Sequence, residues 1–231
     1  MSFSSRLYRP ISNLNFLSKI LERIILFRMN AHFHTFPSLC PLQSAYRKFH
    51  STETALLRIY NDLLLASDRR QVTALVLLDL FSASDTINHQ ILLDRLASFY
   101  RFSGLALSLL RSYLSDRTHD VVVQSSSSPA FHITTGVPQG SVLGPLLFSL
   151  YTSPISHILE NTNTSFHLYA DDTQLYISFS SSDSSSALAS LSHALDSVYS
   201  WLTLNRLSVN PNKTEYLLIG DRKSTRLNSS H

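Results

Sequence analysis

Two apolar, β-prone runs, Phe166–Ala170 and Thr173–Phe179, flank the adjacent aspartates Asp171 and Asp172. Successive side chains of a strand point to opposite faces of the sheet, so two neighbouring aspartates cannot both face one side of a regular strand. The pattern therefore predicts a hairpin whose tight turn carries both carboxylates. Taken alone, an ordinary turn between two strands explains this stretch as well as a functional one does.

A third carboxylate, Asp79, ends the apolar run 73–78. A continuous run of leucine and β-branched residues is typical of a strand buried on both faces, where an acidic residue is unfavourable without a partner. With Asp171 and Asp172 it would form a set of hard oxygen ligands suited to Mg²⁺ or Mn²⁺. Two divalent ions about 3.5–4 Å apart can activate a hydroxyl and neutralise a leaving pyrophosphate, so the set indicates phosphoryl transfer.

Apolar residues at helical spacing predict two helices in the first third of the chain, Asn15–Phe33 and Glu53–Ala66. Ser51 or Thr52 can cap the second helix. We expect each apolar stripe to be buried, with the charged residues of the first helix on a solvated face. The stripes consist of Phe16, Ile20, Ile24 and Phe27 in the first helix and Leu56, Leu57, Tyr60 and Leu64 in the second, and the charged residues are Lys19, Glu22, Arg23 and Arg28.

The rest of the pattern predicts further helices and short strands. The helices are expected at 90–100, 105–114, 142–159 and 188–204, a hairpin between 121–123 and 131–133, a surface loop at 178–186, and strands at 207–209 and 214–219 around the turn 210–213. The stretch Gly136–Ser141 precedes the third of these helices. Its two glycines allow the backbone to approach a ligand closely.

Composition limits the class of protein only broadly. The chain has 231 residues, 44% of them hydrophobic, which is enough for one large domain or two small ones. The single cysteine, Cys40, excludes an internal disulfide framework and fits a reducing compartment. No apolar run is as long as a membrane span, and residues 1–10 lack the apolar core of a signal peptide. The net charge of +3 is weak support for a polyanionic partner, because three basic residues less one acidic residue in 221–231 supply +2 of it.

Five motifs in a fixed order resemble the reverse transcriptase of non-LTR (LINE-type) retrotransposons. They are Tyr-Arg-Pro-Ile-Ser at 8–12, Gln-Ser-x-x-Arg-x-x-His-Ser-Thr-Glu-Thr at 43–54, Leu-Asp-Leu at 78–80, Gly-Val-Pro-Gln-Gly-Ser-Val-Leu-Gly-Pro at 136–145 and Tyr-Ala-Asp-Asp at 169–172. The resemblance runs from about Tyr8 to Gly220. A lone Tyr-Ala-Asp-Asp would be unspecific, whereas five motifs in order are highly specific.

The resemblance implies an α+β fold: the fingers and palm of a right-hand polymerase, with an antiparallel palm sheet backed by helices. We expect fingers elements in 1–75 and the palm in 76–220, with further fingers elements interleaved at about 101–135. No thumb is expected after Gly220, so the chain resembles a fragment of a longer reading frame. Residues 221–231 resemble the conceptual translation of a sequencing adapter and are excluded from the fold prediction.

The resemblance also implies catalytic roles. Asp79, Asp171 and Asp172 match the three catalytic aspartates of the family, and by similarity Asp79 and Asp171 would hold two metal ions directly while Asp172 supports them. The expected cofactor is Mg²⁺, with Mn²⁺ as an alternative. Lys213 corresponds to a palm lysine that protonates pyrophosphate, which a lysine can do because its proton is more mobile than that of arginine.

The nucleotide-binding residues implied by the resemblance are Arg47, Leu80, Ser84, Gln139 and Gly140. Arg47 would grip the triphosphate, and its position just before a helix N-terminus suits a phosphate. Gln139 and Gly140 fall where the family contacts the incoming nucleotide and the template.

The chain departs from the family pattern at the sugar-selecting position. The family usually has an aromatic residue five positions after the first aspartate, where this chain has Ser84, and Phe81 stands where a serine is usual. Ala45 and Tyr46 replace a typical Gly-Phe pair.

The implied function is an RNA-directed DNA polymerase core that uses an RNA template, a DNA primer and deoxynucleoside triphosphates. A second hypothesis is a catalytically inactive relic that keeps the fold, and a third is a metal-dependent nuclease built on the same carboxylates. No membrane partner is expected, and cytoplasm and nucleus are the compartments that the resemblance implies. The sequence leaves the oligomeric state open.

Overall fold

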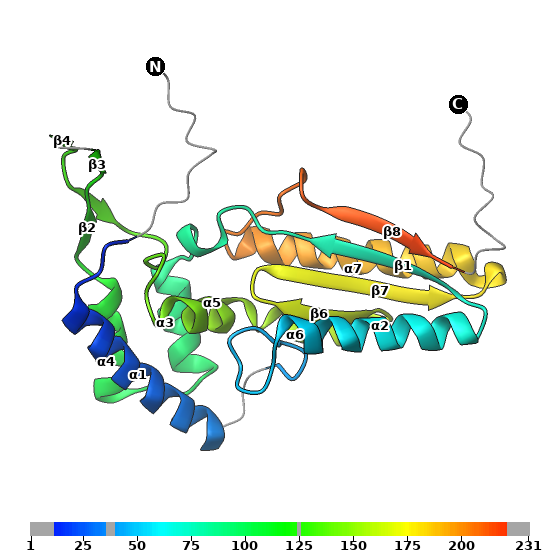
Figure 1. Ribbon diagram of the computed structural model, residues 1–231, viewed down its shortest axis with the longest axis horizontal. Helices are drawn as coiled ribbons and strands as arrows, with labels where there is room; N and C mark the ends of the chain where they lie inside the picture. Colours follow the sequence, from blue (N-terminus) through cyan, green and yellow to red (C-terminus); the bar gives the residue numbers. More distant parts are fainter. Residues whose placement is uncertain (1–11, 36–39, 124–125, 221–231) are drawn as a thin grey trace. The chain divides into compact units, whose positions relative to one another are not determined.

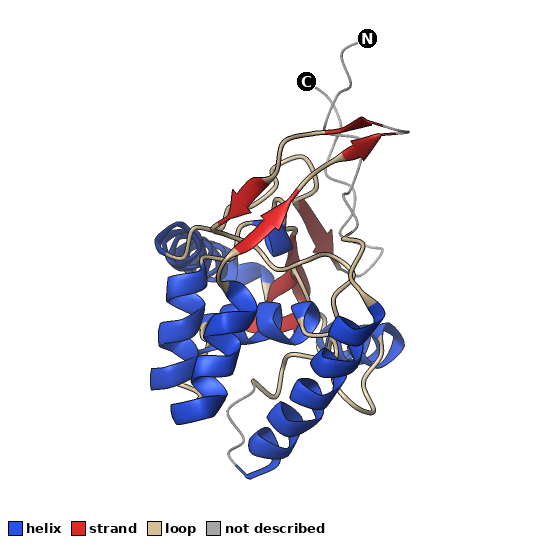
Figure 2. Ribbon diagram, turned by 90° about the vertical axis from the view of Figure 1, so that its left-hand side faces the viewer, coloured by secondary structure: helices blue, strands red, loops and turns tan. Residues whose placement is uncertain are grey.

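The computed structural model describes residues 12–35, 40–123 and 126–220, and it combines helices with antiparallel strands (Figures 1 and 2). The chain divides into two compact units, each built from two separate stretches. The helical unit contains residues 1–38 and 84–151, and the sheet unit contains residues 39–83 and 152–231. The division of these stretches into fingers and palm stays a prediction, and the proposed adapter-like tail lies outside the described residues.

The sheet unit contains a four-stranded antiparallel sheet with the strand order β6-β7-β1-β8. Its strands are β1 (Val72–Leu78), β6 (Ser165–Tyr169), β7 (Asp172–Phe179) and β8 (Glu215–Ile219). Strand β1 lies between β7 and β8 and is antiparallel to both, which confirms the predicted run of buried strand residues before Asp79. In β1, Ala74, Val76 and Leu78 are buried to 4% exposure or less.

Helices cover this sheet and complete its core. The unit contains α2 (Thr52–Asp68), α6 (Ile155–Leu159), the short 3₁₀ turn η3 (Ser181–Asp183) and α7 (Ser184–Leu204). Ile59 of α2 packs with Leu75 and Tyr176, which are register partners on β1 and β7. Helix α7 packs against β7. Because alternate side chains of a strand point to opposite faces, the strands contribute side chains to the packing on both faces of the sheet.

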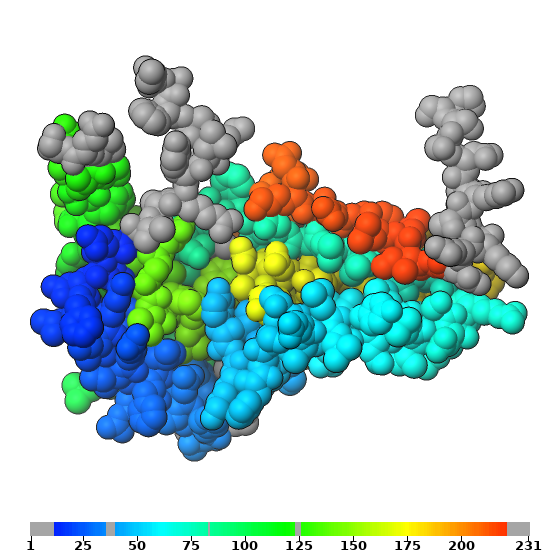
Figure 3. Space-filling model, viewed as in Figure 1, coloured from blue at the N-terminus to red at the C-terminus, as the bar shows by residue number. Residues whose placement is uncertain are grey.

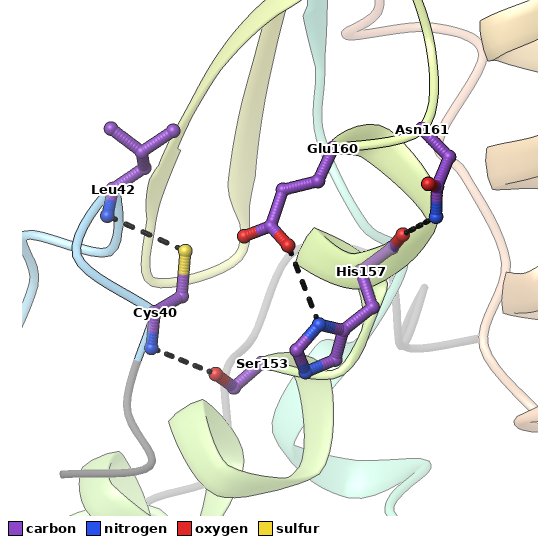
Figure 4. Close-up of polar contacts among 6 residues, drawn as sticks. All are labelled: Cys40, Leu42, Ser153, His157, Glu160 and Asn161. Carbon is purple, nitrogen blue, oxygen red and sulfur yellow. Dashed lines mark hydrogen bonds and ion pairs between the residues drawn. The ribbon is translucent and has the colours of Figure 1, made fainter.

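Polar contacts of 3.4 Å occur in the loop before α2 and in the region of α6, both within the sheet unit (Figure 4). The Cys40 N–H donates to Ser153 Oγ at 3.4 Å, and the Leu42 N–H donates to Cys40 Sγ at 3.4 Å. His157 and Glu160 pair at 3.4 Å on the surface of α6. Cys40 is a buried free thiol, in agreement with the absence of a disulfide framework.

The helical unit is built around α1 (Phe16–Thr35), α3 (His89–Ser98), α4 (Gly104–Leu114) and α5 (Gly144–Thr152), whose last residue belongs to the sheet unit. Its core includes Tyr100 and Tyr151, which are fully buried. The Tyr100 hydroxyl donates to the Leu150 carbonyl at 2.9 Å, so the buried phenol is satisfied. The described helices include none that is both long and apolar enough to cross a bilayer.

The predicted burial of the α2 stripe is wrong. Leu56, Leu57, Tyr60 and Leu64 are 46–66% exposed, and α2 lies at the surface in Figure 3. The buried residues of α2 are Ala55, Ile59 and Ala66. Small side chains let the helix approach the sheet closely, whereas periodicity alone does not say which of two apolar faces of a helix is buried.

The same error occurs in α1. Phe16, Ile20, Ile24 and Phe27 are 39–73% exposed, and the buried residues are Glu22, Ile25, Met29 and Phe33. The helix is apolar on more than one side, so the stripe that looks most regular in sequence is not the one that packs. Glu22, expected on a solvated face, is buried instead.

Three local predictions also need correction. Val122–Val123 (β3) pairs with Ser126–Ser127 (β4), while Phe131–Ile133 (β5) pairs with Arg117–His119 (β2), so the predicted hairpin is two nested pairings. The predicted helix 142–159 is divided into α5 and α6, with Pro154 at the N-cap of α6, because proline cannot continue a helix. The expected loop at 178–186 is mostly the end of β7, η3 and the start of α7.

His167 is a buried titratable group in the core of the sheet unit. It lies on β6 opposite Gln174, is 2% exposed, and within the described residues neither ring nitrogen has a hydrogen-bond partner. Burial lowers the pKa of His167, and the positive charges of Arg58 and His50 lower it further. The folded protein therefore favours the neutral imidazole.

We predict that the protein loses stability as the pH falls below about 6.5, the ordinary pKa of histidine in an unfolded chain. Below that pH the unfolded chain binds a proton that the folded chain resists, so acidification favours unfolding; the stabilisation is fully present above this pKa. Urea unfolding at pH 7.5 and 5.5 measures the effect. His167→Gln should shrink the difference between the two pH values, whereas His193→Gln, at an exposed position, should not. Equal pH dependence in all three proteins would contradict the prediction.

Candidate active site

The predicted hairpin is present, but its two-residue turn is shifted by one position from the predicted Asp171–Asp172 pair. Tyr169 of β6 pairs with Asp172 of β7, so Ala170 and Asp171 form the loop and Asp172 is the first residue of β7. Ala170 has a φ of 55°. A positive φ at the first loop position is typical of the hairpin turns whose twist matches that of the strands.

Asp79 directly follows β1 and lies beside this hairpin. Leu78, the last residue of β1, pairs with Thr173 of β7. Asp79 therefore lies next to Asp172, at the end of the sheet where β1 ends and β7 begins. The Asn210 side chain donates to Asp79 Oδ2 at 3.2 Å, and the Asn210 N–H donates to the Asp79 carbonyl at 2.8 Å. Asn210 therefore holds both the backbone and the carboxylate of Asp79.

Lys213 supplies a positive charge to the same place. Its Nζ is 3.5 Å from Asp79 Oδ2. The side chains of Asp79, Asp172 and Lys213 line one cavity of about 420 Å³. The Lys213 side chain is 53% exposed, so its attraction to Asp79 is screened by solvent.

The three aspartates influence one another electrostatically. Burial raises the pKa of Asp172, and the negative charges of Asp171 and Asp79 raise it further, while Lys213 opposes the shift. A divalent cation would relieve this repulsion, and carboxylate oxygens are ligands that Mg²⁺ and Mn²⁺ prefer. The chemistry of the donor set therefore fits a metal of the predicted kind.

The three carboxylates are divided between two neighbouring cavities, which both include Thr173 in their lining. Asp171 lines a second, smaller cavity with Leu80 and Trp201, apart from the cavity that Asp79 and Asp172 share. In the described part of the chain no group of three His, Cys, Asp or Glu side chains is arranged to hold a metal ion. Which two aspartates bind metal directly stays a prediction.

The loop before α2 runs alongside the hairpin that carries Asp171 and Asp172. Gln43 pairs with Leu168 of β6 in parallel, with the Ser44 N–H donating to the Leu168 carbonyl at 3.0 Å. Tyr46 follows this contact; burial raises its pKa, with a contribution from the charge of Asp171. Tyr46 therefore lies near the turn of the hairpin, a placement that its sequence neighbours do not reveal.

Arg47 is anchored to its own loop. Its Nη1 donates to the carbonyls of Cys40, Pro41 and Gln43 at 3.2–3.4 Å. Ser51 caps α2 and forms a capping box with Thr54, which settles the choice between Ser51 and Thr52. Leu80 is buried and pairs with Val209.

The other predicted nucleotide-site residues belong to the helical unit, where two stretches are joined by hydrogen bonds. The Val137 N–H donates to the Ser84 carbonyl at 2.9 Å, and the Gly136 N–H donates to the Ile87 carbonyl at 2.7 Å. The Gln139 side chain donates to both carboxylate oxygens of Asp85 at 3.0 and 3.1 Å. Ser84 and Gln139 therefore lie in one connected part of this unit.

Asp85 and Asn210 were not singled out from sequence, although each holds a predicted site residue. Asp85 bonds to Gln139, which is 54 positions away, and Asn210 bonds to Asp79, which is 131 positions away. No local pattern identifies such pairs. The motif position of Asn210, three residues before Lys213, is the one signal that could have drawn attention to it.

Comparison with known proteins identifies the family. The family described as "Reverse transcriptase (RNA-dependent DNA polymerase)" matches residues 4–228. The chain belongs to this family. The reverse transcriptase domain is 34% identical over 212 residues to the probable RNA-directed DNA polymerase from transposon BS of Drosophila melanogaster, covering 90% of this chain and 23% of that protein. It is 30% identical over 221 residues to the RNA-directed DNA polymerase from mobile element jockey of the same species, covering 93% of this chain and 24% of that protein.

These matches confirm the predicted relationship to retrotransposon reverse transcriptases. The domain spans about a quarter of the length of these curated relatives. Among solved structures, it resembles telomerase from Candida tropicalis in complex with the TWJ fragment of telomeric RNA, with a TM-score of 0.62 and 16% identity over 88% of this chain and 34% of that one. Apo telomerase from the same species, truncated from its C-terminal domain, gives a TM-score of 0.61, 17% identity and coverage of 91% and 41%. The structural likeness confirms the α+β polymerase fold.

Proposed function

We propose that this reverse transcriptase domain is the core of an RNA-directed DNA polymerase, which adds deoxynucleotides to a primer 3′-hydroxyl on an RNA template. The observation that carries the proposal is the placement of Asp79 and Asp172 at the ends of adjacent strands, with Lys213 in the same cavity. The relationship to retrotransposon RNA-directed DNA polymerases supports it.

Asp79, Asp171 and Asp172 are the residues that we propose to hold the divalent ions. When bound, Mg²⁺ would activate the primer hydroxyl and neutralise charge on the leaving pyrophosphate. Asn210 orients the Asp79 carboxylate through the bond to Oδ2. Because Asp171 lies on the hairpin loop and Asp172 begins β7, the two carboxylates can serve different ligand positions.

Lys213 is proposed as the general acid. Its ammonium lies 3.5 Å from Asp79 Oδ2, beside the carboxylates that would bind the metal ion accompanying the nucleoside triphosphate. From this position it would donate its proton to the leaving pyrophosphate and become neutral. Arg47 is proposed to bind the triphosphate: its guanidinium has five N–H donors, and anchoring through Nη1 leaves others for phosphate oxygens.

Primer extension tests the proposed function. A labelled DNA primer annealed to RNA is incubated with the purified chain, Mg²⁺ and the four deoxynucleotides, and EDTA is added to a parallel reaction. Extension that EDTA abolishes is the expected result. A folded chain that extends no primer would favour the inactive relic, and metal-dependent cleavage of the labelled strands without extension would favour the nuclease.

Ser84 is expected to weaken selection against ribonucleotides. If Ser84 occupies the sugar-selecting position implied by the family pattern, its small side chain leaves room for a 2′-hydroxyl and can hydrogen-bond to it. We predict that Ser84→Phe raises the preference for deoxynucleotides by roughly 10- to 200-fold, the scale of a single pocket contact. Incorporation of dCTP and CTP by both proteins measures this preference.

Phe81→Ala is the control for Ser84→Phe. Phe81 is 53% exposed, and its N–H donates to the Ser208 carbonyl at 2.8 Å. If Phe81 has taken over the sugar-selecting role, Phe81→Ala lowers selectivity and Ser84→Phe leaves it unchanged. Equal selectivity in the wild type and in Ser84→Phe would show that position 84 does not select the sugar.

A further inference from the structure

Glu22 is a buried acidic residue in the middle of α1. It is 2% exposed, whereas its charged neighbours Lys19, Arg23 and Arg28 are exposed. A buried carboxylate is strongly unfavourable unless hydrogen bonds or opposite charges compensate for its lost hydration. The groups that form hydrogen bonds with Glu22 therefore show how its buried charge is compensated.

Two of those partners lie directly before α5, and the third lies in α4. Glu22 Oε2 accepts hydrogen bonds from the backbone N–H groups of Val142 and Leu143, the latter at 3.2 Å. Glu22 Oε1 accepts from the Tyr113 hydroxyl at 3.2 Å. The first N–H groups of a helix have no partner within the helix, and the helix dipole favours a negative charge beside them. The carboxylate of α1 thus satisfies backbone donors that lead into α5.

The same junction holds the loop that precedes α5. The Gly144 N–H donates to Ser141 Oγ at 2.9 Å, and the Gln139 carbonyl accepts from the Ser12 N–H at 3.0 Å. Gly140, between them, has a φ of 88°, a conformation that glycine adopts without strain. The loop is therefore fixed by Glu22 and Ser141 on its α5 side.

Asp85 fixes the other side of this loop through the Gln139 side chain. Gln139 and Gly140 thus lie between two carboxylates, one exposed and one buried. Burial raises the pKa of Tyr113 to about 12, so its phenol remains protonated and continues to donate to Glu22. Glu22 accepts from three donors in this arrangement, two backbone N–H groups and the Tyr113 hydroxyl.

We propose that Glu22 is a positioning residue for nucleotide use, whose buried carboxylate fixes the loop before α5 that carries Gln139 and Gly140. This inference rests on the proposed function and on the family resemblance, which implies nucleotide and template contacts for those two residues. Glu22 itself touches neither substrate nor reacting atoms. A purely structural role would lower the stability of the helical unit without changing the affinity for nucleotide in the protein that remains folded.

Hydrogen exchange of the full chain tests whether Glu22 fixes the loop before α5. This measurement does not require the protein to extend primers. Glu22→Leu keeps a side chain of similar size but removes both carboxylate oxygens, so the Val142 and Leu143 N–H groups lose their acceptor. Glu22→Gln can keep both backbone bonds through its carbonyl oxygen and is the conservative variant that should restore slow exchange. Exchange in residues 137–147 should become at least about tenfold faster, because a buried amide donor loses its acceptor. Tyr113→Phe is the matched control: it removes one donor, leaves the carboxylate and both backbone bonds, and should change this exchange much less.

Single-nucleotide extension and equilibrium binding test the functional part. Glu22→Leu should raise the KM for dTTP and the Kd of the dTTP–Mg²⁺ complex, each by about tenfold, with a smaller change in kcat, and Glu22→Gln should restore most of both. Faster loop exchange with unchanged KM and Kd would overturn the proposal, as would unchanged exchange. If the wild type extends no primer, the proposed function fails by itself, and the comparison of dTTP binding still decides the role of Glu22.

Discussion

Asp171→Asn is expected to abolish primer extension while leaving the domain folded. Asparagine keeps the shape of the side chain but removes a negative ligand, so binding of a divalent ion at the hairpin is lost. Stability should hold or rise slightly, because the charge of Asp171 contributes to the raised pKa of Asp172 and its removal relieves that repulsion. Extension assays at saturating Mg²⁺ and thermal unfolding of the same preparations measure the two effects.

Two comparisons make this result specific. Asp68→Asn makes the same change of charge at an exposed position at the end of α2 and should extend primers like the wild type. Asp172→Asn tests the geometry, since Asp172 shares a cavity with Asp79 whereas Asp171 does not. A fully active Asp171→Asn protein alongside an inactive Asp172→Asn protein would transfer the direct metal role to Asp172.

Gly136→Ala is expected to destabilise the helical unit by about 2–5 kcal/mol, the sum of a left-handed backbone and an overpacked contact. Gly136 has a φ of 84°, and a Cβ there would lie 2.8 Å from the Asp85 carbonyl oxygen and 2.9 Å from its Cα. Both are backbone atoms, and the neighbouring bond from Gly136 to Ile87 at 2.7 Å prevents the two stretches from separating freely. Urea unfolding, followed by circular dichroism, measures the loss.

Gly104→Ala is the matched control for Gly136→Ala. Gly104 also has a positive φ, 55°, but among the described residues no atom outside its own helix backbone and chain neighbours lies within 4 Å of the Cβ that alanine would add. Gly104→Ala should therefore lower the free energy of unfolding only by the backbone strain, about 1–2 kcal/mol. Equal losses in the two variants would show that contact with Asp85 does not matter. A large loss in Gly136→Ala alone, with lower extension in the folded fraction, would support the role of the Gly136–Ser141 loop near the nucleotide.

The sequence alone determined the elements whose signals are local. The run before Asp79 is a buried central strand, and a hairpin lies at the Asp171–Asp172 pair, with its turn shifted by one residue to Ala170–Asp171. Both are predictable because a continuous apolar run and a turn between two apolar runs are each encoded within about ten positions. Five motifs in order also established the family, which the comparisons confirm. Pro154 marks the point where 142–159 divides into two helices, because proline cannot continue a helix, whereas the sequence analysis expected a single helix there.

Only the tertiary structure decided which faces are buried and which distant residues meet. Helices α1 and α2 carry apolar residues on more than one side, and the choice depends on what each helix packs against rather than on its own periodicity. Glu22 looked like a solvated charge because its partner Val142 is 120 positions away. Asn210 was overlooked for the same reason, since hydrogen bonds between distant segments leave no periodic trace in the sequence.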